Sequence, residues 1–292
     1  MKVLIAGRNG QLGREFVKRL AAPEFEVEAP DEKRFDITDR EAVRAITADF
    51  RPDVLINCAA YNLVDDAEED PSAAYAINET GVGHLAAACG EAHAMLVHYG
   101  TDYVFDGQKG APYTEEDEPR PINNYGRSKL AGEQIVRGGL APFLLLRVSW
   151  VFGEGKQNFL CKLLQWADGG GALRVVDDQV SIPTSTAEIV RLTVLALKAG
   201  LTGIYHMTAS GCASRFEAAR CFLTKMGLKN HLIPVASDYF PSPARRPRFS
   251  ALSNAKLAAD LGIAIPDWKS GVDRYAQDLA KETEEPLIEA GL

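Results

Sequence analysis

The first half of the chain alternates between short apolar runs and longer stretches in which apolar residues recur every three or four positions. Runs that predict strands, most of them almost wholly apolar, occupy residues 2–7, 25–30, 53–60, 94–101 and 143–153. Periodic stretches that predict helices occupy residues 11–22, 39–50, 69–92 and 124–138. Because strands and helices alternate, we predict the α/β class with a Rossmann-type, doubly wound parallel sheet.

The pattern becomes looser in the second half. A loop rich in glycine, proline and acidic residues is predicted at 106–122, and beyond residue 153 the predicted helices and strands are 158–170, 172–179, 185–200 and 203–209. Short helices and a loop rich in proline and arginine follow from residue 214. We therefore predict two interleaved domains. The Rossmann domain takes residues 1–150 and about 184–207, and a smaller mixed α/β substrate domain takes about 151–183 and 208–292.

Composition narrows the class of protein. The 292 residues carry a net charge of −8, which argues against general affinity for nucleic acid. The five cysteines form no Cys-x-x-Cys pair and fit small apolar side chains in a reducing compartment. The chain shows no signal peptide and no apolar run of the roughly 20 residues that span a membrane, so we expect a cytoplasmic protein. The histidines have no ligand spacing, which predicts no histidine-built metal site.

A glycine-rich segment, GRNGQLG, places Gly7, Gly10 and Gly13 between the first predicted strand and helix. Glycines there let the backbone approach a pyrophosphate, and the helix N-terminus supplies free N–H groups. The spacing differs from the G-x-G-x-x-G of many dehydrogenases, so a plain tight turn is the alternative. Asp31 suits a ribose 2′-hydroxyl and favours NADH, whereas Arg8 suits a 2′-phosphate and favours NADPH. The sequence leaves that choice open.

Three polar residues form a candidate catalytic set. Tyr125 and Lys129 are four residues apart and share a face of one predicted helix. Thr101 ends a predicted strand, and ligands of open α/β sheets bind at the carboxyl ends of strands. Reducing a ketone requires a proton donor, and a phenol with a pKa of about 10 needs a nearby cation to serve well at neutral pH. We predict Tyr125 as the acid, Lys129 as the cation that lowers its pKa, and Thr101 as a carbonyl-orienting donor. The alternative is a buried ring beside a solvated lysine.

Matching segments extend almost from end to end: GRNGQLG, DVLINCAAY, VDDAEED, TDYVFDG, YGRSKLAGE, RVSWVFG, NF, DDQ, PTST, YHMTASG, PARRP and PDW. On these segments the chain resembles the extended short-chain dehydrogenases/reductases and, among them, the dTDP-4-dehydrorhamnose reductase family. The resemblance implies that a dTDP-linked 4-keto-6-deoxy sugar is reduced at C4 to dTDP-L-rhamnose, with NADPH or NADH as the cofactor. It also implies that the second domain binds the sugar nucleotide.

The resemblance also implies roles for individual positions. Tyr125 would donate the proton, Lys129 would be its partner, and Thr101 would assist. Cofactor positions would be Gly7, Gly10, Gln11, Leu12, Gly13, Asp31, Asp36, Ile37, Ala60, Tyr61, Asn62, Tyr99, Tyr125 and Lys129. Substrate positions would be Thr101, Asp102, Trp150, Asn158, Arg245 and Arg246. The alternatives are a core aromatic for Trp150 and a solvated loop for the two arginines. Some family members use Mg²⁺ at a dimer contact, and the sequence leaves both the metal and a homodimer open.

Some positions depart from the family pattern. Gly100 stands where the family usually has serine, which removes a hydroxyl expected near the site, and Asn62 and Asp66 change polarity beside the nicotinamide. A 4,6-dehydratase is disfavoured because such relatives carry Asp-Glu directly after the threonine, and here the pair is Asp102-Tyr103. An epimerase and a non-catalytic dinucleotide-binding regulatory subunit stay as alternatives. The intact catalytic set argues against the regulatory subunit.

Overall fold

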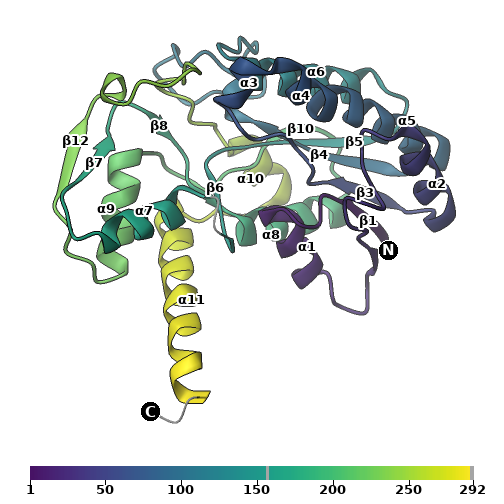
Figure 1. The fold of residues 1–292 in the computed structure, drawn as a ribbon. Coiled ribbons are helices and arrows are strands. Elements are labelled where there is room, and N and C mark those ends of the chain that lie inside the picture. The colour runs from purple at the N-terminus through teal and green to yellow at the C-terminus, as the bar shows by residue number, and fades with distance from the viewer. Residues whose placement is uncertain (156–157, 290–292) are drawn as a thin grey trace.

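A six-stranded parallel sheet forms the centre of the protein in the computed structural model, which describes residues 1–155 and 158–289 (Figure 1). In spatial order its strands are β10 (Gly203–His206), β5 (Phe143–Val148), β4 (Met95–Thr101), β3 (Val54–Asn57), β1 (Lys2–Ala6) and β2 (Glu26–Glu28). All five pairings are parallel. The chain reverses its direction of winding between β1 and β3, so the predicted doubly wound α/β fold is confirmed.

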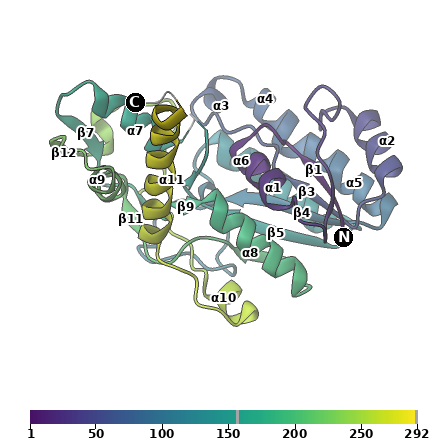
Figure 2. The same cartoon turned by 90° about the horizontal axis from the view of Figure 1, so that it is seen from below.

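Helices cover both faces of this sheet. On one face, α1 (Gln11–Arg19) packs beside α8 (Thr186–Lys198), as the view from below also shows (Figure 2). On the other face lie α2 (Arg40–Phe50), α5 (Val82–Ala92) and α6 (Asn124–Gly138). The inner strands β1, β3, β4 and β5 are buried on both sides, which explains why their sequences are mostly apolar, whereas the edge strand β2 is partly exposed and contains two glutamates.

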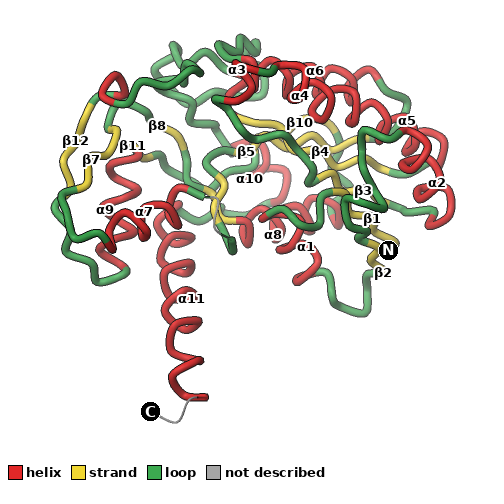
Figure 3. Tube along the Cα trace, in the orientation of Figure 1, coloured by secondary structure: helices red, strands yellow, loops and turns green. Residues whose placement is uncertain are grey.

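A second apolar core lies beside the sheet. It is built from α7 (Phe159–Asp168), α9 (Arg215–Lys225) and the first part of α11 (Trp268–Glu289). Two short strand pairs border it: β7 (Leu173–Val176) with β12 (Leu232–Val235), and β8 (Val180–Ser181) with β11 (Ala213–Ser214). Figure 3 shows β7 and β12 at the end of the molecule opposite β1 and β2. The remaining helix, α10 (Ala255–Leu261), packs near β10.

Two predicted elements are interrupted. The strand predicted at 143–153 ends at Val148, because Trp150 has a φ of 37° and turns the chain out of the sheet. The next residues form β6 (Val151–Phe152), which pairs with β9 (Thr184–Ser185). The helix predicted at 69–92 consists of α4 (Pro71–Tyr75), a π-helical segment η1 (Ala76–Gly81) and α5, and a short α3 (Asp66–Glu69) precedes them.

Over the described residues, none of the helices is sufficiently long and apolar to traverse a bilayer.

Candidate active site

The glycine segment forms a tight turn at the carboxyl end of β1. Gly7 has a φ of +77°, and a Cβ there would stand 2.5 Å from the Ala59 backbone nitrogen. A Cβ on Gly13 would stand 2.2 Å from the Gly7 carbonyl oxygen. Gly10 begins α1 without a side-chain cap, so the first N–H groups of the helix stay available. The turn therefore lies at the reversal between β1 and β3 and fits the pyrophosphate of a dinucleotide.

A cavity of about 420 Å³ adjoins this turn, and both Arg8 and Asp31 line it. The Arg8 guanidinium donates to the Ala29 carbonyl at 2.8 Å, and Asp31 accepts from the Arg34 backbone N–H at 3.1 Å. Arg34 also lines the cavity and pairs with Glu28 at 3.3 Å. Asp31, which suits a ribose hydroxyl, and Arg8, which suits a 2′-phosphate, thus line the same cavity, and Arg34 adds a second arginine that the sequence analysis did not name.

Asp36 and Ile37 follow along the chain and are not among the residues that line this cavity. The Asp36 carboxylate accepts from both the backbone N–H and the hydroxyl of Thr38, at 2.9 and 2.8 Å. The Ile37 side chain is buried, and it lies where a Cβ on Gly81 would be. Leu12 packs at the margin of the sheet core, whereas Gln11 reaches Asn158 across the two cores at 3.1 Å.

The loop after β3 contains Ala60, Tyr61 and Asn62, and it is fixed by Asn78 of η1. The Asn78 side chain bonds both the N–H and the carbonyl of Tyr61, at 2.9 and 3.1 Å, and donates to the Ser128 hydroxyl. This arrangement holds the loop against α6. In the same loop, the Asn62 side chain accepts a hydrogen bond from the Tyr125 hydroxyl at 3.4 Å.

The predicted catalytic residues come together at the carboxyl end of β4. Asn123 caps α6 by accepting from the Gly126 N–H at 2.7 Å, which sets Tyr125 in the first turn. The Tyr125 ring is buried edge-on against Tyr103, with centroids 5.8 Å apart. Burial raises its pKa above the ordinary value, although a hydrogen bond with Thr101 opposes the rise. Tyr125 and Thr101 therefore face each other.

Lys129 differs from the prediction. Its ammonium is 3% exposed and donates to the Tyr99 backbone carbonyl at 2.6 Å, while the Tyr99 hydroxyl points elsewhere and bonds Thr193. Burial lowers the pKa of Lys129 to about 8, and the charge of Glu133 opposes this fall. The predicted lowering of the Tyr125 pKa by Lys129 is wrong for this structure, since burial dominates. The phenol is therefore protonated at neutral pH, the form that a proton donor requires, but its raised pKa makes it a weaker acid, so proton transfer depends on stabilising the phenolate that forms.

Asp102 is buried, and both carboxylate oxygens are engaged. One accepts from Thr101 at 3.3 Å, and the other accepts from Ser181 at 2.9 Å and Ser250 at 2.5 Å. Despite these bonds, burial raises its pKa to about 6. Our sequence reasoning missed both serines. They come from distant segments, and no local pattern identifies them.

Trp150 and Asn158 border the second core. The strained Trp150 backbone directs its half-buried ring under the Arg215 guanidinium, which lies 4.4 Å from the ring centroid. Asn158 caps α7 by accepting from the Cys161 N–H at 3.0 Å, and its amide donates to the Gly153 carbonyl at 2.9 Å. Asn158 is thus a structural cap as well as a neighbour of the glycine turn.

A cavity of about 1090 Å³ opens between the loop at 106–108, α7, β7 and residues 237–248. Its walls are strongly basic, in contrast to the acidic chain as a whole. The cationic residues are Lys162, Arg174, Arg215, Arg245, Arg246 and Arg248, and the aromatic ones are Phe159, Trp166 and Phe240. Arg246 forms a two-point ion pair with Asp65, at 2.6 and 3.0 Å. The sequence prediction named Arg245 and Arg246 but missed the other basic residues, which are scattered along the chain.

The doubly wound sheet, the glycine turn and the Thr101, Tyr125 and Lys129 arrangement define an extended short-chain dehydrogenase/reductase. The solved structure of a UDP-glucose 4-epimerase from Thermus thermophilus with NAD has this fold, with a TM-score of 0.81 at 23% identity.

Closer relatives narrow the class. The family model described as RmlD substrate binding domain matches residues 1–281. A dTDP-4-dehydrorhamnose reductase of Mycolicibacterium smegmatis is 38% identical over 98% of this chain and 88% of the relative. The structure of a dTDP-4-dehydrorhamnose reductase from Bacillus anthracis in complex with NADP has a TM-score of 0.92 and 34% identity, covering 95% and 99% of the two chains. The chain therefore belongs to the dTDP-4-dehydrorhamnose reductase family.

Proposed function

We propose that this chain reduces the C4 ketone of dTDP-6-deoxy-L-lyxo-4-hexulose to dTDP-L-rhamnose. The family relationship supports the reaction, and one geometric observation carries it. Thr101, Tyr125 and Lys129 meet at the carboxyl edge of the sheet, beside a glycine turn that fits a pyrophosphate and a basic cavity that fits a nucleotide diphosphate. A bound nicotinamide would supply the hydride.

The residues of the site then have distinct tasks. Tyr125, protonated at neutral pH, gives its proton to the developing alkoxide oxygen, and Thr101 donates a hydrogen bond that orients the carbonyl. Lys129 keeps a positive charge near the phenolate that forms and offers N–H donors to the nicotinamide ribose. The buried position of all three excludes water from the proton transfer.

The large basic cavity is the proposed site of the dTDP group. Arginine suits a diphosphate because its planar fork binds two oxygens at once. Arg215, Arg245 and Arg246 line this cavity, and Arg215 also lies over Trp150, the proposed neighbour of the sugar. We retain the proposed division of the chain, in which residues 1–150 and about 184–207 bind the dinucleotide and the rest binds the sugar nucleotide.

The cofactor is NADPH or NADH. The Bacillus anthracis relative is solved with NADP, and Arg8 and Arg34 beside the cavity support a 2′-phosphate, so we propose NADPH as the preferred form with NADH accepted through Asp31. A cytoplasmic location stays a prediction from the sequence, which leaves a homodimer and the use of Mg²⁺ open.

The test is a coupled assay on the purified chain. The keto sugar is generated from dTDP-glucose by an upstream dehydratase and epimerase, and oxidation of NADPH or NADH is followed by loss of its near-ultraviolet absorbance. We expect oxidation only when the epimerase is present, faster with NADPH. Oxidation without the epimerase would point to a different keto sugar. Tight dinucleotide binding with no turnover would favour the regulatory alternative.

A further inference from the structure

A buried charged cluster lies directly behind the active site. Glu133 of α6 and Arg147 of β5 form an ion pair with Nη2···Oε2 at 2.8 Å, supported by Arg147 Nε at 3.1 and 3.2 Å from the two carboxylate oxygens. Both side chains are almost completely buried. Removing two charges from water is costly, and a buried ion pair often stabilises a fold no better than apolar side chains would. The presence of this pair in the core therefore suggests a role other than stability.

Glu133 is the third member of a line that begins at the catalytic site. Tyr125, Lys129 and Glu133 are spaced four residues apart on α6 and so share one face of the helix. A Cβ on Gly100 would stand 2.4 Å from Glu133 Oε1, which places this carboxylate against β4 between the Tyr99 carbonyl and Thr101. The hydroxyl missing at Gly100 would therefore start toward Glu133 rather than toward the substrate crevice.

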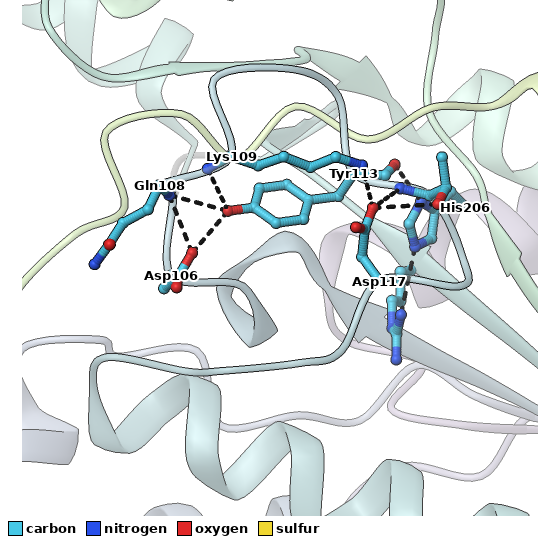
Figure 4. A network of polar contacts seen from close by, with 8 residues as sticks. Asp106, Gln108, Lys109, Tyr113, Asp117 and His206 are labelled. Carbon is cyan, nitrogen blue, oxygen red and sulfur yellow. Dashed lines mark hydrogen bonds and ion pairs between the residues drawn. The ribbon is translucent and has the colours of Figure 1, made fainter.

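Arg147 is held in place from its other side. His206 Nδ1 lies 3.0 Å from the Tyr113 carbonyl, which can only accept, so this nitrogen carries the proton. Burial and Arg147 lower the pKa of His206 to about 3, so the ring is neutral and Nε2 accepts from Arg147 Nη1 at 3.4 Å. Figure 4 shows His206 beside Tyr113, whose hydroxyl bonds Asp106 and the Gln108 and Lys109 N–H groups.

The groups around Lys129 show which charge acts on it. From β4 come the Tyr99 carbonyl and His98, whose pKa is lowered by burial and by Lys129 itself, so it is neutral. The short helix η2 (Asp102–Val104) contributes Asp102 and Tyr103 beside Tyr125. On the outer side of α6, η1 presents the neutral Asn78. Glu133 is the carboxylate whose charge favours the ammonium form of Lys129, and Arg147 partly cancels that charge.

We propose that Glu133 is a positioning residue that keeps Lys129 charged in its buried site, and that Arg147 sets how strongly it does so. This inference rests on the proposed function, in which Lys129 acts as a cation. It separates two roles that a buried ion pair can have. If the pair only supports the fold, losing either partner has the same kind of effect. If it tunes Lys129, the two losses have opposite effects.

The experiment measures the alkaline limb of the pH profile of kcat/KM, together with NADPH binding by fluorescence over the same pH range. The alkaline limb reports Lys129, because burial raises the pKa of Tyr125 beyond it. We expect Glu133→Gln to move the limb down by about one pH unit or more, since a charge one helical turn away is lost and Arg147 is left unopposed. Arg147→Met should move the limb up, and Glu133→Asp should leave it near that of the wild type.

A matched control is Glu15→Gln. Glu15 is also a buried helical glutamate paired with an arginine, Arg19, but α1 lies on the opposite face of the sheet from α6. The alkaline limb of the kcat/KM profile of Glu15→Gln should equal that of the wild type. If Glu133→Gln does not fold, the double variant Glu133→Gln/Arg147→Met removes both charges and leaves none unpaired. The alkaline limb of the double variant should fall by less than one pH unit, because Glu133 is the charge that acts directly on Lys129.

Equal shifts in the same direction for both single variants, or no shift in either, would overturn the inference, as would a double variant with a limb at or above that of the wild type. Failure of the proposed function is distinguishable. The wild type could reduce no dTDP-linked keto sugar while the pH dependence of NADPH binding still shifts in opposite directions in Glu133→Gln and Arg147→Met. That result would refute the proposed reaction and support the tuning role.

Discussion

Asp102→Asn should change how the stability of this protein depends on pH. The carboxylate is 2% exposed, and burial raises its pKa from 3.8 to about 6 in spite of bonds from Thr101, Ser181 and Ser250. A folded-state pKa above the unfolded value means that the folded protein binds this proton more tightly. The contribution of Asp102 to stability is therefore greatest in acid and is lost as the pH rises through about 6.

The size of the effect follows from the shift. Two pKa values about two units apart correspond to about 3 kcal/mol over the whole range, of which about 1.4 kcal/mol falls between about pH 8 and pH 5. Asparagine keeps the shape of the side chain but does not titrate there. On going from about pH 8 to about pH 5, wild type should therefore gain about 1.4 kcal/mol relative to Asp102→Asn.

Urea unfolding of both proteins at several pH values measures this difference, and the other titrating groups cancel because both chains contain them. Parallel stability curves would refute the reasoning, since they would mean that folding leaves the pKa of Asp102 unchanged. A difference of the opposite sign would mean that Ser181 and Ser250 stabilise the charged form more than burial disfavours it.

Three further predictions concern the site and the helix that carries it. Tyr125→Phe should keep NADPH affinity in fluorescence titration and lose turnover about 10²- to 10⁴-fold, because only the proton donor is removed; near-normal turnover would contradict the mechanism. Gly132→Ala should destabilise the protein by about 1–3 kcal/mol in urea, since its Cβ would stand 2.1 Å from a carbonyl oxygen of η1. The control Gly138→Ala, with nothing within 4 Å, should be neutral or stabilising, and equal losses would exclude the steric cause. Arg246→Met should raise KM for the sugar nucleotide about tenfold or more with KM for NADPH unchanged, whereas Asp65→Asn should not raise it; equal increases would mean that the ion pair, not the arginine, matters.

The sequence predicted the parts of the fold that depend on local pattern. Apolar runs identified the sheet, and Gly7 and Gly13 identified a close turn that the structure contains. The strand that ends at Val148 could not be divided correctly, because the break is made by the backbone of Trp150 and by the pairing of β6 with the distant β9. Nothing in the run of apolar residues distinguishes these two pairings.

The site shows the same division. The spacing of Tyr125 and Lys129 and the position of Thr101 at a strand end were enough to bring the three residues together. The partners of Asp102 and the basic wall at Arg174 and Arg215 depend on segments far apart in the chain, which only the folded structure juxtaposes. The electrostatics of Tyr125 were predicted wrongly for a related reason, since burial is a property of the assembled core.

The position of β10 at the edge of the sheet has a consequence for synthesis. As the chain leaves the ribosome, β5 is complete at Val148, but its outer edge has no partner until residues 203–206 have emerged. An apolar strand with an unpaired edge is a template for aggregation, so a nascent chain that stalls in this interval is at risk. The Asp102 carboxylate likewise lacks its donor from Ser250 until nearly the whole chain has been made. We therefore expect chains truncated near residue 150 to aggregate, and we expect productive folding to occur late, when residues 203–206 and Ser250 can reach β5 and Asp102.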